Sequence, residues 1–177
     1  MSIVAGVDSS TQSCTIELRD GDSGVLLSRG RRPHPPTFPP VSEQNPADWW
    51  EAFKGALHDA LEAASVGPQA IDAISVGAQC HGLVAMDEHG DVLRPVKLWN
   101  DTTSAPQADA MVEKLGAERW VRTAGSVPTA AFTITKLAWL AEHEPETLRR
   151  VRAVCVPHDW LTYKLTGRRR RRSEGGC

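Results

Sequence analysis

Apolar residues at the start of the chain follow the two-residue period of β-strands. Ile3 to Val7 is a short apolar run that ends at Asp8. Cys14 to Arg19 alternates apolar and polar positions, as a strand with one buried face does. Asp20 to Gly24 is rich in turn residues, and Val25 to Leu27 begins a third strand. The N-terminal part is therefore predicted to be a β-meander.

The spacing then changes from extended to helical. Arg31 to Pro46 is rich in proline, which predicts an extended surface loop. Asn45 is suited to cap a helix that begins at Pro46. Apolar residues recur at helical spacing until Gly67-Pro68, where the helix should end. These residues are Trp49, Phe53, Ala56, Leu57, Ala60 and Leu61.

A stretch that ends at Asp101 combines three apolar runs with polar residues at their ends. Ile71 to Val76 is predicted to be a buried strand that breaks at Gly77. Leu83 to Met86 is a second apolar run, and it leads into the acidic turn from Asp87 to Asp91. A third run follows that turn and ends in a tryptophan, an asparagine and an aspartate. The bland interpretation of this stretch is a hairpin with an ordinary polar rim.

The remaining pattern is mostly helical. Four helices, one strand and a last helix are predicted, in that order. They are Ala105 to Leu115, Glu118 to Thr123 (a short helix or a turn), Phe132 to His143, Pro145 to Arg150, the buried strand Ala153 to Val156, and a helix from Pro157 that stops at Gly167.

The polar residues at two of the strand ends suit a small polyhydroxylated ligand. They are Gln79, Cys80 and His81 after the first run, and Trp99, Asn100 and Asp101 after the third. Amide and carboxylate groups bind hydroxyls, and an aromatic face covers the C–H side of a sugar. We therefore expect the two segments to converge on one sugar pocket.

The first turn of the meander has a separate chemical interpretation. Asp8, Ser10, Thr11 and Gln12 follow a strand end, where hydroxyls and backbone N–H groups can bind the phosphates of a nucleotide. The Asp8 carboxylate would hold Mg²⁺ through water, because Mg²⁺ keeps much of its hydration shell. A plain polar hairpin turn remains the alternative. The sequence has no GxxxxGK[ST] string, which argues against a P-loop.

Composition excludes several classes of function. Hydrophobic residues make up 41% of the 177 residues and charged residues 24%, enough for a packed core. The net charge is −2 even though Arg168 to Arg172 are five consecutive arginines, so the body is not a nucleic-acid binder by charge. Four cysteines without CxxC spacing predict neither a zinc site nor a disulfide framework. No apolar run approaches the length of a membrane span, and a cytoplasmic location is expected.

The order of the motifs resembles the N-terminal half of an FGGY carbohydrate kinase, and its xylulokinase branch most closely. The resemblance covers nearly the whole chain up to Gly167, and its joint order is specific. The matching segments are Gly6 to Thr11, Ser42 to Pro46 with Trp49-Trp50, Gly77 to Gly82, Leu93 to Pro95 with Leu98 to Asp101, Phe132-Thr133 with Lys136-Leu137, and Val156 to Thr162 with Leu165 to Gly167. It implies an α/β fold of the ribonuclease-H-like, actin-type ATPase kind, in which helices flank a mixed sheet and which is incomplete in this chain.

The resemblance also implies an activity, the ATP-dependent phosphorylation of D-xylulose at O5 during D-xylose breakdown. By matching position, Cys80-His81 and Trp99 to Asp101 would contact the sugar, while Asp8 and Thr11 would face Mg²⁺-ATP. Cysteine stands at 80 where the family often has methionine, and Ser10 stands where it often has glycine. The family's catalytic aspartate lies beyond the matching stretch, so the resemblance assigns no catalytic residue here.

These points predict a partial sugar-binding domain at 1–167, a disordered basic tail at 168–177, and no C-terminal ATP-binding domain. The isolated chain is expected to be nearly inactive and to expose apolar surface that favours association, with homo-oligomers left open. Two alternatives are a non-catalytic sugar-binding protein on the same fold and a non-functional gene fragment. A frame error or cloning junction is favoured over a nucleic-acid-binding patch as the origin of the tail.

Overall fold

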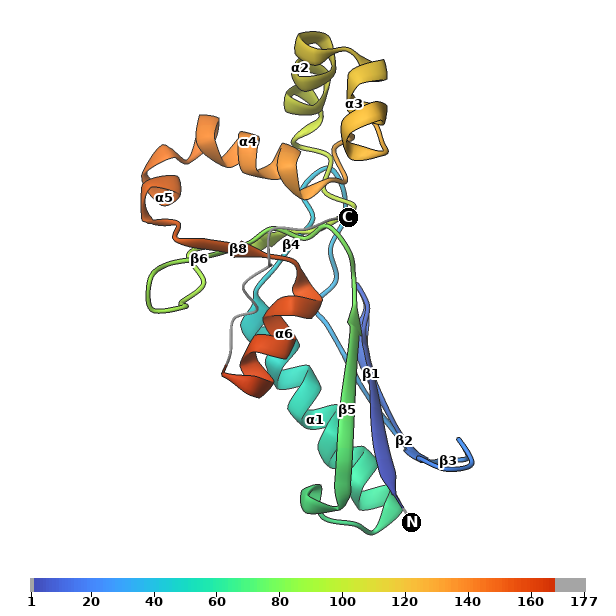
Figure 1. The fold of residues 1–177 in the computed structure, drawn as a ribbon. Coiled ribbons are helices and arrows are strands. Elements are labelled where there is room, and N and C mark those ends of the chain that lie inside the picture. The colour runs from blue at the N-terminus through green and yellow to red at the C-terminus, as the bar shows by residue number, and fades with distance from the viewer. Residues whose placement is uncertain (1, 168–177) are drawn as a thin grey trace.

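A four-stranded sheet forms one half of the molecule in the computed structural model, which describes residues 2–167. The strands are β1 (Ile3–Ser9), β2 (Ser13–Asp20), β3 (Leu26–Pro33) and β5 (Ile71–Ala78), and their order across the sheet is β3-β2-β1-β5. β2 is antiparallel to both of its neighbours, whereas β1 and β5 are parallel. The predicted β-meander is thus confirmed, and β5 extends it into a mixed sheet (Figure 1).

Helix α1 (Pro46–Ala64) covers one face of the sheet and buries the alternating apolar residues of the meander. Ile3, Ala5 and Val7 of β1 point into the same core as Ile16 and Leu18 of β2. The face of α1 that carries Phe53, Ala56 and Ala60 packs into this core, which confirms the predicted helical spacing. Burial of apolar surface in this layer is the main source of its stability.

The backbone of α1 lies directly on β3 at Gly30. A Cβ atom at Gly30 would lie 1.9 Å from the carbonyl oxygen of Ala56. No side chain fits that space, so the glycine sets how closely the helix approaches the strand. The predicted capping is also present, since Asn45 Oδ1 accepts a hydrogen bond of 3.0 Å from the N–H of Ala47.

The other half is built from short strands and helices around a second core. β4 (Glu43–Gln44) pairs with β7 (Val96–Lys97), and β6 (Val84–Met86) pairs with β8 (Ala153–Cys155). α6 (Pro157–Thr166) packs beside α1, where the Trp49 and Trp160 rings meet edge to face at 6.0 Å. The second core consists of Trp49, Val84, Met86, Val96, Leu98, Trp160 and Leu161.

The remaining predicted helices are present at close to their expected bounds. They are α2 (Ala105–Leu115), α3 (Ala117–Ala124), α4 (Thr133–His143) and α5 (Pro145–Arg150), and a short 3-10 helix, η1 (Pro68–Ala70), precedes β5. α2 and α3 project from the end of the molecule farthest from the start of β1 (Figure 1). No helix within residues 2–167 is both long and apolar enough to cross a bilayer.

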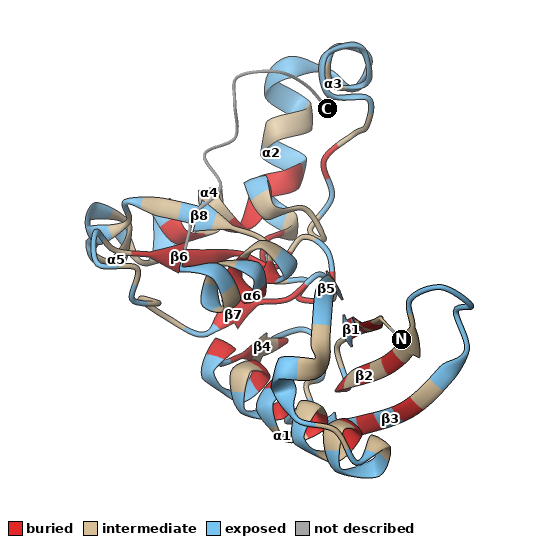
Figure 2. Ribbon diagram, turned by 60° about the horizontal axis from the view of Figure 1, so that its bottom comes forward, coloured by how far each residue is buried: buried red, intermediate tan, exposed pale blue. Residues whose placement is uncertain are grey.

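Two strands predicted to be buried are largely exposed. β5 has no buried residue and Ile74 is 40% exposed, because β5 is the edge strand of the sheet and α1 packs on β2 and β3. β8 is also open, with Val154 46% exposed. Figure 2 shows this contrast, since β6 and β7 are coloured as buried while β5 and α3 are not.

The structure also bears on the proline-rich connection and on two of the cysteines. The proline-rich connection is shorter than predicted, because β3 continues to Pro33. Cys14 is fully buried, and burial raises the pKa of its thiol to about 12, whereas Cys155 is only half-buried. The tail expected at 168–177 lies outside the described residues.

Candidate functional site

The turn between β1 and β2 contacts both segments that were predicted to bind a sugar. The Thr11 hydroxyl accepts a hydrogen bond of 2.9 Å from the indole Nε1 of Trp99 and donates to Gln79 Oε1 at 3.5 Å. The parallel pairing of β1 with β5 makes this possible, because it brings the carboxyl ends of both strands to the same edge. The N–H of Gln79 also donates to the carbonyl of Ser9 at 3.0 Å.

Gln44 joins the β1–β2 turn and the Gln79 segment to the start of α1, although the sequence gives no local signal for this role. Its amide nitrogen donates to the carbonyl of Thr11 at 3.0 Å, and its carbonyl oxygen accepts from Trp49 Nε1 at 2.8 Å and Gln79 Nε2 at 3.4 Å. The residue is buried and lies immediately before the cap of α1. The turn, β5 and the start of α1 are therefore held in one hydrogen-bonded unit.

His81 adopts a backbone conformation that is uncommon for a non-glycine residue. Its φ is 59°, in the left-handed region, where strained residues concentrate at functional sites. The imidazole stacks on Phe132 with ring centroids 4.7 Å apart, and Thr133 Oγ1 donates to its carbonyl at 3.1 Å. Cys80 beside it is exposed. The start of α4 thus fixes the direction of the histidine ring.

Trp99 and Asn100 lie on a cleft of about 680 Å³. The cleft opens between the β1–β2 turn and the proline-rich loop, and Trp99 is 46% exposed. Its lining residues are Ser10, Thr11, Gln12, His34, Pro36, Thr37, Phe38, Trp99 and Asn100. The cleft thus joins residues predicted for the phosphates with residues predicted for the sugar, whereas Cys80 and His81 are not part of its lining.

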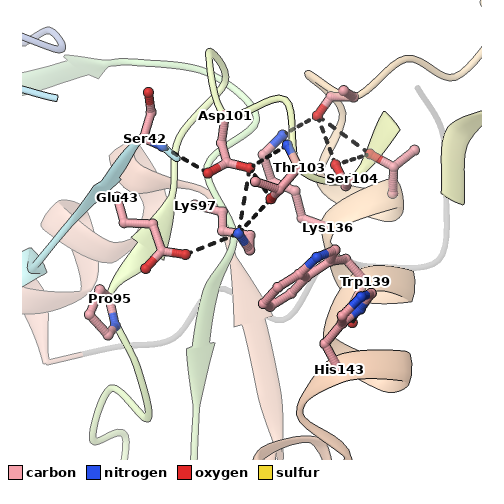
Figure 3. Close-up of polar contacts among 12 residues, drawn as sticks. Ser42, Glu43, Pro95, Lys97, Asp101, Thr103, Ser104, Lys136, Trp139 and His143 are labelled. Carbon is pink, nitrogen blue, oxygen red and sulfur yellow. Dashed lines mark hydrogen bonds and ion pairs between the residues drawn. The ribbon is translucent and has the colours of Figure 1, made fainter. Parts of the chain in front are cut away.

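Asp101 is fully buried and does not line the cleft, and its carboxylate lies in a polar network with Ser42, Lys97 and Thr103 (Figure 3). Its carboxylate accepts hydrogen bonds from the N–H of Ser42 at 2.9 Å and the N–H of Thr103 at 3.0 Å, and it pairs with Lys97 Nζ at 3.5 Å. Lys97 also pairs with Glu43 at 3.0 Å and lies 3.8 Å from the centre of the Trp139 ring. Asp101 therefore stabilises the Trp99-Asn100 segment through buried hydrogen bonds.

A second buried lysine, Lys136, fastens the start of α4. Its Nζ donates to the carbonyls of Ala130 and Ala131, both at 2.6 Å, just before the phenylalanine that stacks on His81. Burial lowers the pKa of Lys136 to about 8, and Asp101 opposes that shift. The two lysines brace the two loops that carry the aromatic residues of the site.

His34, Thr37 and Phe38 are cleft residues that the sequence interpretation did not identify. They belong to the proline-rich loop, which has no periodicity from which to infer a direction for its side chains. His34 is 6% exposed, and burial lowers its pKa to about 4 despite the opposing charge of Asp48. Its ring is therefore neutral at pH 7, and its Nε2 lies 3.2 Å from the hydroxyl of Ser9.

Asp8 was predicted to hold a magnesium ion. It lies at the end of β1 and is exposed, and Ser10 and Thr11 follow it in the turn. A single carboxylate fits a largely hydrated Mg²⁺, which needs one or two protein oxygens beside phosphate oxygens. Residues 2–167 contain no group of three or more His, Cys, Asp or Glu side chains arranged for a metal. Asp8 is thus compatible with an ion that a nucleotide would also bind.

The mixed sheet with its flanking helices is the actin-type ATPase fold of solved sugar kinases, and the hydroxyl-rich turn and the aromatic-walled cleft lie at one edge of that sheet. The chain belongs to the FGGY family of carbohydrate kinases, because the model of that family's N-terminal domain matches residues 3–172. Both the predicted family and the predicted fold are thereby confirmed.

Individual relatives agree with this assignment. A xylulose kinase from Streptomyces rubiginosus is 48% identical over 166 residues, which are 93% of this chain and 34% of that protein. A xylulose kinase from Bacillus subtilis is 34% identical over 94% of this chain and 34% of its own length. The crystal structure of xylulose kinase from Bifidobacterium adolescentis superposes with a TM-score of 0.86 at 41% identity, covering 99% of this chain and 36% of that one. The chain thus spans about a third of the length of these relatives.

Proposed function

We propose that this chain is the sugar-binding part of a carbohydrate kinase that transfers phosphate from ATP to O5 of D-xylulose, as a step of D-xylose breakdown. The family match and the names of the relatives support the choice of reaction class and sugar. The observation that carries the proposal is the Thr11 hydroxyl, which contacts Trp99 and Gln79 from the turn proposed to face the phosphates. A phosphoryl acceptor and donor must meet in line at such a junction.

On the acceptor side, we assign sugar contacts to Gln79, Cys80, His81, Trp99 and Asn100. The amides and the imidazole offer hydrogen bonds to hydroxyls, and the half-exposed Trp99 ring offers an apolar face. Asp101 acts differently in this proposal. Its buried carboxylate positions the loop of Trp99 and Asn100 through the N–H groups of Ser42 and Thr103.

On the donor side, Ser10, Thr11 and Gln12 would contact phosphate oxygens of ATP through hydroxyls, the side-chain amide and turn N–H groups. Asp8 would hold Mg²⁺ through water. The ion would neutralise charge on the phosphates as they transfer. The residues proposed to bind the sugar and those proposed to bind the phosphates meet at the carboxyl ends of β1 and β5.

None of the described residues is assigned as the base that takes the proton from the sugar hydroxyl. Loss of a general base lowers the rate by about 10²–10⁴-fold. Many kinases also depend on the closure of two lobes around the reactants. We therefore expect the isolated 177-residue chain to bind sugar and to turn over little. A cytoplasmic location, and association of chains through exposed apolar residues such as Ile74, belong to the same proposal.

Two measurements on the purified chain test the proposal. Calorimetric titration with D-xylulose should show saturable binding, and His81→Asn should weaken it, because asparagine tolerates the left-handed backbone but cannot replace the imidazole. A coupled assay with ATP and D-xylulose should show little turnover. Robust turnover would contradict the expected inactivity. Absence of any sugar binding would contradict the proposed sugar site and favour a non-functional fragment.

A further inference from the structure

The left-handed backbone of His81 depends on support from another element. Its φ is 59°, a value that a non-glycine residue keeps only where the surrounding structure holds it. Two contacts come from the start of α4: the imidazole stacks on Phe132 with ring centroids 4.7 Å apart, and Thr133 Oγ1 donates to the His81 carbonyl at 3.1 Å. The direction of the histidine ring is therefore set by where α4 begins.

The start of α4 is fixed by side chains of its own first turns. Phe132 precedes the first residue of the helix, and its side chain makes no capping hydrogen bond. Thr135 Oγ1 donates to the carbonyl of Phe132 at 2.8 Å. Lys136 reaches further back, and its Nζ donates to the carbonyls of Ala130 and Ala131, both at 2.6 Å. Because these two residues lead directly into Phe132, Lys136 fixes the path on which the chain enters α4.

A positive charge is unfavourable at this position unless it is used. Lys136 is completely buried, and its amino group lies at the N-terminal end of a helix, which carries a positive partial charge. A methionine would fill a similar space without that charge. The two hydrogen bonds of Lys136 are short for N–H···O bonds, as charge-assisted bonds are. The charge thus strengthens the hold on the two carbonyls.

Three titratable groups act on the amino group of Lys136. The Asp101 carboxylate and Cys80 favour the charged form, Lys97 opposes it, and burial is the largest influence. Lys136, Asp101 and Lys97 all belong to the polar cluster drawn in Figure 3. Burial lowers the pKa of Lys136 to about 8, from 10.5 ordinarily. The amino group is therefore mostly charged at pH 7 and mostly neutral at pH 9.

We propose that Lys136 is a positioning residue of the sugar site: its charged amino group fixes the entry to α4 and thereby holds Phe132 against His81. This role rests on the proposed function, because it takes His81 as a contact of the sugar. It adds a residue that does not itself contact the sugar but controls how well the sugar binds. Sugar binding should therefore weaken in alkali, as Lys136 loses its proton.

Titration of the unaltered 177-residue chain with D-xylulose from pH 7.5 to pH 9.5 tests the role of the charge. We expect the affinity to fall about three- to tenfold with a midpoint near pH 8, because charge-assisted hydrogen bonds are about twice as strong as neutral ones. Ordinary histidines are already neutral in this range, whereas ordinary thiols titrate within it. The same fall should therefore be measured in Cys80→Ser, whatever the affinity of that variant.

Two substitutions at position 136 separate charge from packing. Lys136→Met keeps the length of the side chain without charge or donors, and should weaken D-xylulose binding about tenfold at pH 7.5. Lys136→Arg keeps a charge throughout the range, and should remove the pH dependence. Lys114→Met is the matched control, because Lys114 is exposed on α2. It should bind D-xylulose as the parent chain does at each pH.

The Lys136→Met variant is expected to fold, because the partners of Lys136 keep other contacts. Asp101 still pairs with Lys97 at 3.5 Å, and the carbonyl of Ala130 still accepts from Ser104 Oγ at 3.2 Å. A cooperative urea transition would show that a loss of binding is not a loss of fold. If the variant does not fold, the pH titration of the parent chain decides the matter.

Proton resonances of the His81 imidazole report the stacking without any sugar. The ring current of Phe132 should shift them upfield, and His81→Asn identifies them in the spectrum. Both Lys136→Met and pH 9.5 should move them towards the positions of exposed histidines such as His58. Lys114→Met should leave them in place at pH 7.5.

The outcomes distinguish this inference from the proposed function. D-xylulose affinity that is constant from pH 7.5 to pH 9.5, or equal in Lys136→Met and the parent chain, would overturn the positioning role and leave the proposed function intact. A chain that binds no D-xylulose at any pH would overturn the proposed function. In that case, His81 resonances that move with Lys136 would still support the hold on the ring, and unmoved resonances would overturn it.

Discussion

The two halves of the molecule are stabilised by different forces. In the half formed by the meander and α1, the buried residues are apolar or small and uncharged apart from a neutral histidine, as Cys14, Ile16 and Leu18 illustrate. In the half that follows β5, the buried residues include Lys97, Asp101 and Lys136. The first half therefore depends on shape, and the second depends on matching each buried charge with a partner. The proposed sugar loops belong to the second kind.

The largest effect is expected from breaking the charge network. Asp101→Ala removes one of the two carboxylates that pair with Lys97, the other being Glu43, and it removes the acceptor of two backbone N–H groups. Breaking a buried pair typically costs about 3–5 kcal/mol, and we expect the lower end because Glu43 remains. Urea unfolding measures the change, and Asp109→Ala, at an exposed position of α2, serves as the control. A cost below about 1 kcal/mol would show that this half does not depend on its charges.

The complementary change tests shape in the first half. Gly30→Ala places a methyl group 1.9 Å from the Ala56 carbonyl oxygen, so α1 must move off β3. We expect a loss of about 3 kcal/mol in unfolding free energy, the upper end of the range for overpacking. Gly6→Ala is the matched control, because nothing lies within 4 Å of a Cβ at Gly6 in the same sheet. Equal stability of the two variants would rule out the close packing.

Acid should lower the unfolding free energy through protonation of His34. The buried His34 has a pKa of about 4, against 6.5 ordinarily. The unfolded chain therefore binds a proton between these values that the folded chain does not, and stability falls as pH drops from 6.5 to 4. The contribution is at most about 3 kcal/mol. In urea titrations, the loss of stability between pH 7 and pH 4 should be smaller for His34→Gln than for the parent chain, and an equal loss would contradict the role of His34.

The smallest effect concerns the start of α1. Asn45→Ala removes the side-chain oxygen that caps the helix and should cost about 1 kcal/mol in thermal or urea unfolding. Asn45→Ser keeps a capping oxygen and should lower the unfolding free energy by only about 0.3 kcal/mol. If both substitutions destabilise equally, the cap is not what Asn45 contributes.

Local patterns predicted most of the fold. The period-two run at Cys14 and the helical spacing from Trp49 to Ala60 each specify an element within a few residues of the chain. The position of a strand at the edge of a sheet cannot be inferred from such a pattern, because an apolar strand has the same sequence pattern whether or not a neighbour covers it. Ile71 to Val76 was therefore wrongly predicted to be buried. The partners of β6 and β7 are likewise set by residues distant in sequence.

The candidate site was predicted unevenly for a related reason. Trp99 and Thr11 were chosen by residue type at strand ends, and the structure joins them by a hydrogen bond. Asp101 has the residue type of a ligand contact, yet its backbone position turns it inward. His34 and Phe38 lie in a loop whose prolines set an extended backbone without a repeating face. Their direction depends on tertiary contacts, such as that between His34 and Ser9.

The parallel alignment of β1 with β5 has a consequence for how such a protein can diversify. Backbone pairing from Val4 with Ala73 to Ser9 with Ala78 determines where the turn and the Gln79 segment meet. The side chains at Cys80 and His81, which follow β5, take no part in that pairing. If Cys80 and His81 contact the sugar as proposed, mutation can exchange them, and with them the preferred substrate, while the meeting point of the two strand ends stays unchanged.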